Sequence, residues 1–170
     1  MLAALEEDAG NHKKSARILM KAVGRNVRNL SEVVGPLTAS MLSMDATDEL
    51  EEFLQQANAR KASTSAALQS AEMFKMRAGA PDATSYLVEL LKRHPTLRGL
   101  TGLSALIVET SEGAQKEWMT VLHNLLKQIS ESNPLYHCEG CGFTAKRLFW
   151  LCPGCQQWGL VVPITGPDGD

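Results

Sequence analysis

The 170-residue sequence is poor in the residues that mark several protein classes. It has 13 glycines and 7 prolines, and 44% of its residues are hydrophobic, which excludes collagen-like, mucin-like and fully disordered chains. Neither sign of charge dominates, because 17 Lys and Arg residues stand against 19 Asp and Glu residues for a net charge of −2. Without a global positive charge, we expect no general attraction to nucleic acid or to an acidic membrane.

Long hydrophobic runs are also missing. The segment Met1–Leu5 is too short for a signal peptide and is followed by acidic residues. The longest uncharged stretch, Leu148–Pro167, contains three prolines and three glycines and could not satisfy its backbone in lipid. We therefore expect a soluble, cytoplasmic protein with no membrane span in this chain.

Cysteine is absent from the first 137 residues, and all four cysteines then occur within 18 positions. They form two Cys-x-x-Cys turns separated by ten residues, a pattern that presents four thiolates to one tetrahedral ion. A disulfide framework would have its cysteines scattered along the chain. The clustering of these four therefore favours a protein from a reducing compartment. The predicted metal ligands are Cys138, Cys141, Cys152 and Cys155.

Two other uses of these cysteines are a dithiol redox site and an electron-transfer centre. A thioredoxin-like redox site needs one Cys-x-x-Cys where a strand meets a helix, whereas this segment has two and no following helix. Four thiolates accept iron as well as zinc, so a rubredoxin-type electron carrier remains an alternative.

The segment 135–170 is predicted to be a small metal-binding domain. Its 36 residues are too few for a core to hold a fold unaided, and coordination supplies the missing stability. Gly142 after the first cysteine pair provides a permissive backbone, and Gln156 takes the equivalent place after the second. Five of the nine aromatic residues lie here, and we expect some to enclose the cluster and others to pack on the last helix, 114–132.

Those aromatic residues also suggest a platform for stacking bases, which makes a zinc-ribbon nucleic-acid-binding module a further alternative. The charge of the segment argues against it, because two basic residues, Lys146 and Arg147, face three acidic ones.

The first 132 residues are rich in helix-forming residues with apolar positions three and four apart. Turn residues Gly10, Asp45, Gly79 and Gly113 recur at a period of 34 or 35 residues, which indicates helix-pair repeats. Each is followed nine residues later by a large apolar residue, namely Leu19, Leu54, Val88 and Leu122. We predict a mostly α fold: a tetratricopeptide-like α-solenoid of about four helix pairs over 1–132, then the small rubredoxin-like or zinc-ribbon β domain over 135–170. An ordinary bundle with evenly spaced loops is the alternative.

The intervening helices are expected at 30–42, 63–77 and 97–109. The pair Gly35-Pro36 is predicted to kink or interrupt the first of these, because proline lacks a donor and crowds the preceding turn. Nine residues before Gly10 are too few for a full helix, and Leu2 and Leu5 have no upstream repeat to pack on. We expect the chain to begin inside a longer solenoid, with a first helix that frays or mediates self-association.

No catalytic constellation is evident. The sequence has no phosphate-binding loop, and its four histidines, His12, His94, His123 and His137, are far apart with no spacing that suggests a site. We expect these histidines to be surface or capping residues, the protein to be non-enzymatic, and the solenoid to hold other proteins.

Several segments together resemble the C-terminal part of the lipopolysaccharide assembly protein B family. The rubredoxin-like likeness lies in 136–145, 148–158, Pro163-Ile164 and 166–169, and the last repeats of that family resemble Arg93–Arg98 and Ser111–Glu117. The resemblance spans nearly the whole chain and is most specific after Arg93.

The resemblance implies a metal-bearing adaptor that regulates lipopolysaccharide biosynthesis at the cytoplasmic face of the Gram-negative inner membrane. Members of the family promote proteolysis of the committed-step deacetylase by the membrane protease FtsH, and the family pattern assigns Cys138, Cys141, Cys152 and Cys155 as metal ligands. The N-terminal membrane helix and the earlier repeats of the family have no counterpart in this sequence.

Overall fold

A computed structural model describes residues 2–26, 30–60 and 63–169 of the protein. These residues form eight helices followed by three short strands, which confirms the predicted mostly α fold with a small β unit at its end. Residue contacts divide the chain into two compact units, 1–77 and 78–170, which we describe separately. The expected division between 1–132 and 135–170 is a different one and stays a prediction.

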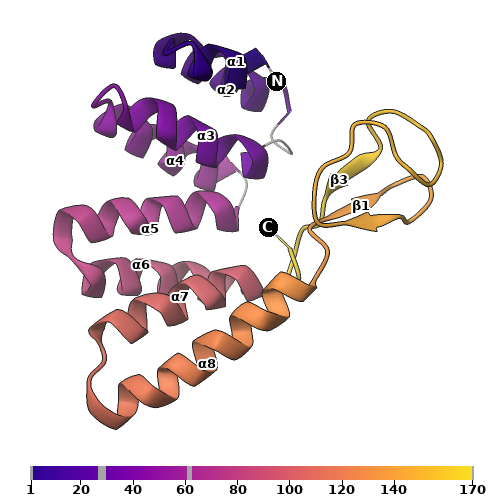
Figure 1. The fold of residues 1–170 in the computed structure, drawn as a ribbon. Helices are drawn as coiled ribbons and strands as arrows, with labels where there is room; N and C mark the ends of the chain where they lie inside the picture. Colours follow the sequence, from indigo (N-terminus) through magenta and orange to yellow (C-terminus); the bar gives the residue numbers. More distant parts are fainter. Residues whose placement is uncertain (1, 27–29, 61–62, 170) are drawn as a thin grey trace. The chain divides into compact units, whose positions relative to one another are not determined.

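The first unit is built from five helices (Figure 1). They are α1 (Leu2–Asp8), α2 (His12–Arg25), α3 (Leu30–Leu42), α4 (Thr47–Arg60) and α5 (Thr64–Ala78). Helix α1 packs on α2, α2 on α3 and α3 on α4, and α5 contributes Ala66 and Met73 to the same core. The second unit contains three helices and a sheet, namely α6 (Ala80–Arg93), α7 (Leu97–Thr110), α8 (Gly113–Ser132), β1 (Tyr136–Cys138), β2 (Thr144–Ala145) and β3 (Val161–Pro163). The predicted helices at 30–42, 63–77 and 97–109 are therefore confirmed to within one residue at each end.

The four turn residues of the predicted repeat share one backbone feature. Gly10, Asp45, Gly79 and Gly113 all have a positive φ, of 74°, 55°, 96° and 55°. Each stands at the first residue of α2, α4, α6 or α8 or within two residues before it, where a short connection leads into that helix. Glycine enters this conformation without steric cost, and aspartate is among the residues that tolerate it best. The period found in the sequence is thus a period of left-handed turns.

The apolar residue predicted nine positions after each turn is buried in the first two copies, half-buried in the third, at Val88, and exposed in the last. Leu19 and Leu54 are buried in the core of the first unit, whereas Leu122 is 45% exposed. Helix α8 has no buried residue at all among its described positions. Among the described residues, the face of α8 that carries Leu122 and Leu125 is left largely exposed.

Helix α3 does not follow the predicted interruption at Gly35-Pro36. It continues from Leu30 to Leu42 with Pro36 inside it. Two features, one local and one tertiary, make this possible. Proline crowds the Cβ of the residue before it, and Gly35 has none. The face of α3 that carries Val33, Val34 and Leu37 is buried in the core, so tertiary packing compensates for the missing hydrogen bond.

Helix α1 is short, as expected, and its Leu2 and Leu5 side chains are about 60% exposed. A polar cluster at its C-terminal end ties it to the next two helices. Glu7 accepts a hydrogen bond from the Ser40 hydroxyl of α3 at 2.5 Å and lies 2.7 Å from Nδ1 of His12 on α2. The Ser40 hydroxyl also lies 3.1 Å from that of the buried Ser15. These bonds, the Ser40 bond first, hold the pKa of Glu7 below its ordinary value.

In the second unit, α6 and α7 approach each other closely at Gly99. A Cβ built on Gly99 would lie 2.4 Å from the end of the Leu91 side chain of α6, so a larger residue would force that side chain to move. The buried Thr96 caps α7 by accepting a hydrogen bond from the Gly99 amide at 3.1 Å.

The sheet has the strand order β2-β1-β3, with both pairs antiparallel. It follows α8 directly (Figure 1). Two hydrogen bonds join the segments that flank its strands to the helices. The Lys146 ammonium donates to the Glu131 carbonyl in the last turn of α8, and the Leu97 amide at the start of α7 donates to the Pro167 carbonyl at 2.8 Å. The second bond satisfies a first-turn N–H group that no intrahelical carbonyl can reach.

Substituting two glycines of the first unit by alanine should have opposite effects on its stability. Neither added Cβ would meet an atom within 4 Å, so backbone conformation alone decides the outcome. Gly10→Ala places a Cβ in a left-handed turn and should lower the free energy of unfolding by about 1 kcal/mol. Gly24→Ala lies in α2 and should raise it by about 0.5–1 kcal/mol. Urea denaturation followed by circular dichroism measures both, and a loss of stability in both variants would contradict the assignment.

The Glu7 cluster should make the first unit sensitive to acid. A carboxyl whose pKa is lowered in the folded state contributes stability at pH values above its ordinary pKa, and that contribution is lost as the pH falls below 4.5 through the lowered value. We therefore expect Glu7→Gln to be less stable than the parent at pH 7, with the difference shrinking on acidification.

Ser40→Ala should raise the Glu7 pKa towards its ordinary value in an NMR titration of the side-chain carboxyl. The exposed Ser43, which donates to the Ala39 carbonyl, gives the matched control Ser43→Ala. An unchanged Glu7 pKa in Ser40→Ala would refute the role given to this hydroxyl.

Candidate metal centre

The two Cys-x-x-Cys turns have the same backbone hydrogen bonds. In the first, Gly142 N–H donates to the Cys138 carbonyl at 2.9 Å and Cys138 N–H donates to the Phe143 carbonyl at 2.8 Å. In the second, Gln156 N–H donates to the Cys152 carbonyl at 2.9 Å and Cys152 N–H donates to the Gln157 carbonyl at 3.0 Å.

Gly142 and Gln156 both have a positive φ, of 74° and 56°, as the equivalence of their sequence positions implies. The chain thus repeats one turn twice, and in each turn a left-handed residue follows the second cysteine.

These turns bring the four predicted ligands together. The sulfur atoms all lie within 4.8 Å of one another, with 3.7 Å between those of Cys138 and Cys155 and 3.6 Å between those of Cys141 and Cys152. Disulfide bonds are excluded, because bonded sulfurs are about 2.05 Å apart. The edge of a tetrahedron with metal–sulfur distances of about 2.3 Å is about 3.8 Å. The four thiols therefore fit one tetrahedral ion of zinc or iron.

Backbone amides also favour a thiolate in the second turn. The N–H groups of Cys155 and Gly154 point to the Cys152 sulfur and lower its pKa to about 7. The Gln157 amide lowers the pKa of Cys155, but burial and the neighbouring thiols outweigh it and raise that pKa to about 11. Cys152 therefore loses its proton more readily than Cys155. The deprotonated thiolate is the form that binds a metal.

Close packing shapes the cluster. Cys138 and Cys152 are buried, and Cys141 is exposed. A Cβ added to Gly154 would lie 3.1 Å from the Cys141 sulfur, and one added to Gly140 would lie 2.8 Å from the Leu160 side chain. Both intervening glycines therefore allow the two turns to approach.

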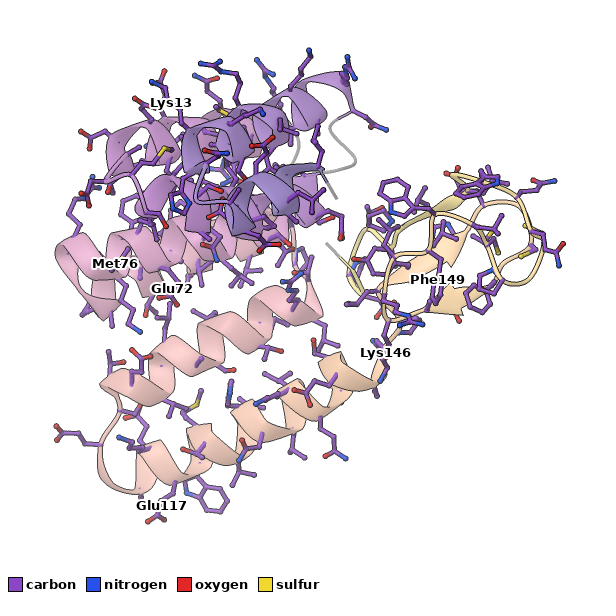
Figure 2. All side chains as sticks on the ribbon, turned by 45° about the horizontal axis from the view of Figure 1, so that its top comes forward. Lys13, Glu72, Met76, Glu117, Lys146 and Phe149 are labelled. Carbon is purple, nitrogen blue, oxygen red and sulfur yellow. The ribbon has the colours of Figure 1, made fainter. Side chains whose placement is uncertain are left out.

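The aromatic residues of this segment divide into two groups. Phe143 and Phe149 pack edge to face, with 6.0 Å between their ring centroids, and lie against the small core formed by Tyr136, Val161 and the buried cysteines. Phe149 lies within the segment that carries the sheet (Figure 2). Trp150 and Trp158 remain 64% and 73% exposed. The expectation that aromatic residues enclose the cluster is confirmed for the first group. The expectation that others pack on the last helix is wrong for the two tryptophans, because most of the surface of both side chains is exposed.

The expectation that the histidines are surface or capping residues holds for His94. It fails for His12, His123 and His137, which are half-buried. His94 caps the C-terminus of α6, and its amide donates to the Leu90 carbonyl. His12 belongs to the Glu7 cluster, and His123 lies 2.9 Å from the hydroxyl of the buried Ser104. The sequence did not reveal Glu7 as the partner of His12 or Ser104 as the partner of His123. Neither pair has a spacing that forms a recognisable sequence motif.

Within the ranges that the structure describes, no helix combines the length and the apolar character that crossing a membrane requires.

Two kinds of comparison relate this chain to known proteins. Residues 136–163 match the family model of the rubredoxin metal binding domain. Over 161 residues, 94% of its length, the chain is 34% identical to lipopolysaccharide assembly protein B of Escherichia coli strain K12 and covers 41% of that protein. It is also 26% identical over 170 residues to lipopolysaccharide assembly protein B of Haemophilus influenzae strain Rd, of which it covers 43%.

The chain thus spans about two fifths of the length of the curated relatives it matches. The matched metal-binding segment includes all four cysteines, and the likeness extends through the helices before it. The chain is thus similar, over nearly all of its own length, to part of lipopolysaccharide assembly protein B, and the similar part includes the rubredoxin metal binding domain.

Proposed function

We propose that this protein is a non-enzymatic, metal-containing adaptor that regulates lipopolysaccharide biosynthesis. The observation that carries the proposal is the likeness to lipopolysaccharide assembly protein B over 94% of the chain, together with the convergence of four sulfurs in its rubredoxin-like segment. In this proposal the helices bind partner proteins, and the metal site braces the segment that follows them.

The proposed ligands of a single zinc or iron ion are Cys138, Cys141, Cys152 and Cys155. Their mutual distances, the paired left-handed turns and the thiolate-favouring amides around Cys152 support this assignment. When bound, the ion links the two turns and so stabilises a sheet with very little core of its own. Residues 135–170 then form a metal-binding domain, and residues 1–132 form tetratricopeptide-like repeats.

The polar clusters support a structural role over a catalytic one. In the Glu7 cluster the carboxylate contacts both His12 and Ser40, so the imidazole is not placed to activate the hydroxyl. In the other pair, the hydroxyl of Ser104 is directed at the Thr101 carbonyl and the residue is only 3% exposed. A nucleophile must reach its substrate, and this one cannot.

The proposed partners are the membrane protease FtsH and the committed-step deacetylase of lipopolysaccharide synthesis, as the family resemblance implies. The proposed place of action is the cytoplasmic face of the inner membrane. In this scheme the adaptor presents the deacetylase to the protease and thereby limits the flux into lipopolysaccharide.

Metal analysis tests the ligand assignment. The purified protein should contain about one zinc or iron per chain by mass spectrometry, and the double variant Cys141→Ser with Cys155→Ser should lose it. Glu139→Gln, which alters a residue between two ligands, is the matched control and should retain it. The double variant should lose the NMR signals of the sheet while its helical circular dichroism changes by less than about a tenth, because helix repeats rely on neighbouring contacts. Full metal content in the double variant would refute the assignment.

Capture from cells tests the adaptor role. The tagged protein should retain the deacetylase or the protease from a lysate of a Gram-negative bacterium, and the double cysteine variant should retain at least about tenfold less if the ordered metal domain is needed for binding. Failure of the metal-loaded protein to retain either enzyme would contradict the proposed partners.

A further inference from the structure

We infer that helices α2 and α4 form a groove that binds an acidic protein segment containing apolar side chains. This inference rests on the proposed adaptor function and specifies the chemistry of one partner. It concerns only the first unit.

Two hollows lie along one face of α2. One, of about 710 Å³, is lined at its N-terminal end by Lys13 and Arg17, and the other, of about 410 Å³, by Met20 and Gly24. The spacing of these four residues, four, three and four positions, places them on a single face of a helix. The two hollows therefore follow each other along the same side of α2.

Helix α4 forms the opposite wall of the second hollow. Phe53, Ala57 and Arg60 line it, again at helical spacing. Ala57 is buried, Phe53 is half-buried, and Met20 on the facing helix is 37% exposed. Apolar groups thus form the floor of the groove.

The rim of the groove is positively charged. Lys13, Arg17 and Arg60 line the hollows, and no carboxylate is found among the described residues that line either one. These three cations form no ion pair within the described part of the chain, whereas the neighbouring Lys14 is neutralised by Glu6 at 2.5 Å. Lys13 lies at the surface of the unit (Figure 2). Helix α2 contains five Lys and Arg residues and no acidic residue, so its side of the groove is positive. The acidic residues of α4 that line neither hollow are Asp48, Glu49, Glu51 and Glu52.

This combination fits a protein segment better than a membrane or a nucleic acid. The apolar groups are recessed between two helices, where single side chains can enter but a flat bilayer cannot. Three cations are few for a phosphate backbone, and the groove has no exposed aromatic residue for base stacking in its described lining. A segment with carboxylates and leucine-like side chains would satisfy both the rim and the floor.

A synthetic probe tests this pairing directly. A fluorescein-labelled peptide of three Leu-Leu-Glu-Glu repeats should bind the full chain in fluorescence anisotropy, more weakly as salt is raised. Two control peptides replace every Glu by Lys or every Leu by Ser, and both should bind at least about tenfold more weakly.

Matched variants locate the site. Arg17→Glu and Arg60→Glu, which reverse charges on the rim, should each weaken peptide binding by about tenfold or more. Lys21→Glu makes the same charge change one turn along α2 at a position that lines neither hollow, and it should weaken binding by less than about threefold. Met20→Gln should weaken binding without altering its salt dependence. Circular dichroism checks that each variant remains folded.

Several results would overturn the inference. Equal losses in Arg17→Glu and Lys21→Glu would indicate diffuse charge attraction, and equal binding of the Lys peptide would remove the charge complementarity. Vesicles containing phosphatidylglycerol that bind the chain in place of the peptide, with the same sensitivity to Arg17→Glu, would identify a membrane surface.

The peptide-binding experiment and the capture experiment can fail separately. If the chain captures the deacetylase or protease but not the peptide, the groove assignment fails alone. If the peptide binds and neither enzyme is captured, the proposed partners fail alone.

Discussion

The helices of this protein depend on one backbone constraint, which is a residue with positive φ every 34 or 35 positions. Gly10, Asp45, Gly79 and Gly113 are these residues, and each stands in, or at the end of, a short connection between two consecutive helices. A β-branched residue at these positions would oppose the turn. Within the first unit, the turns at Gly10 and Asp45 precede α2 and α4, the helices that contribute to the Glu7 cluster and form the α2–α4 groove.

The metal centre uses the same constraint on a smaller scale. Gly142 and Gln156 are left-handed residues that close two matching turns, and these turns aim four sulfurs at one point. The helices and the metal centre differ in the interactions that stabilise their turns. Helix pairs bury large apolar side chains such as Leu37 and Leu50, whereas the sheet buries few, which makes coordination the natural source of its stability.

The sequence allowed local features to be predicted well. Turn residues, helix bounds and the cysteine pairs follow from spacing, because each depends on neighbours only a few positions away. Continuation of α3 through Pro36 was missed because packing of its buried face overrides the local preference. The bond between Glu7 and Ser40 joins residues 33 positions apart, and the exposure of Leu122 depends on which elements surround α8, so no pattern within one segment reveals either.

The hydrogen bond from Leu97 to Pro167 couples two distant parts of the second unit. It links the first turn of α7 to a position 70 residues later, beyond the last strand. When the C-terminal tail detaches, that amide loses its acceptor and becomes open to solvent. The rate at which the Leu97 amide exchanges its hydrogen with deuterium therefore reports how often the tail opens, from a position within the helices.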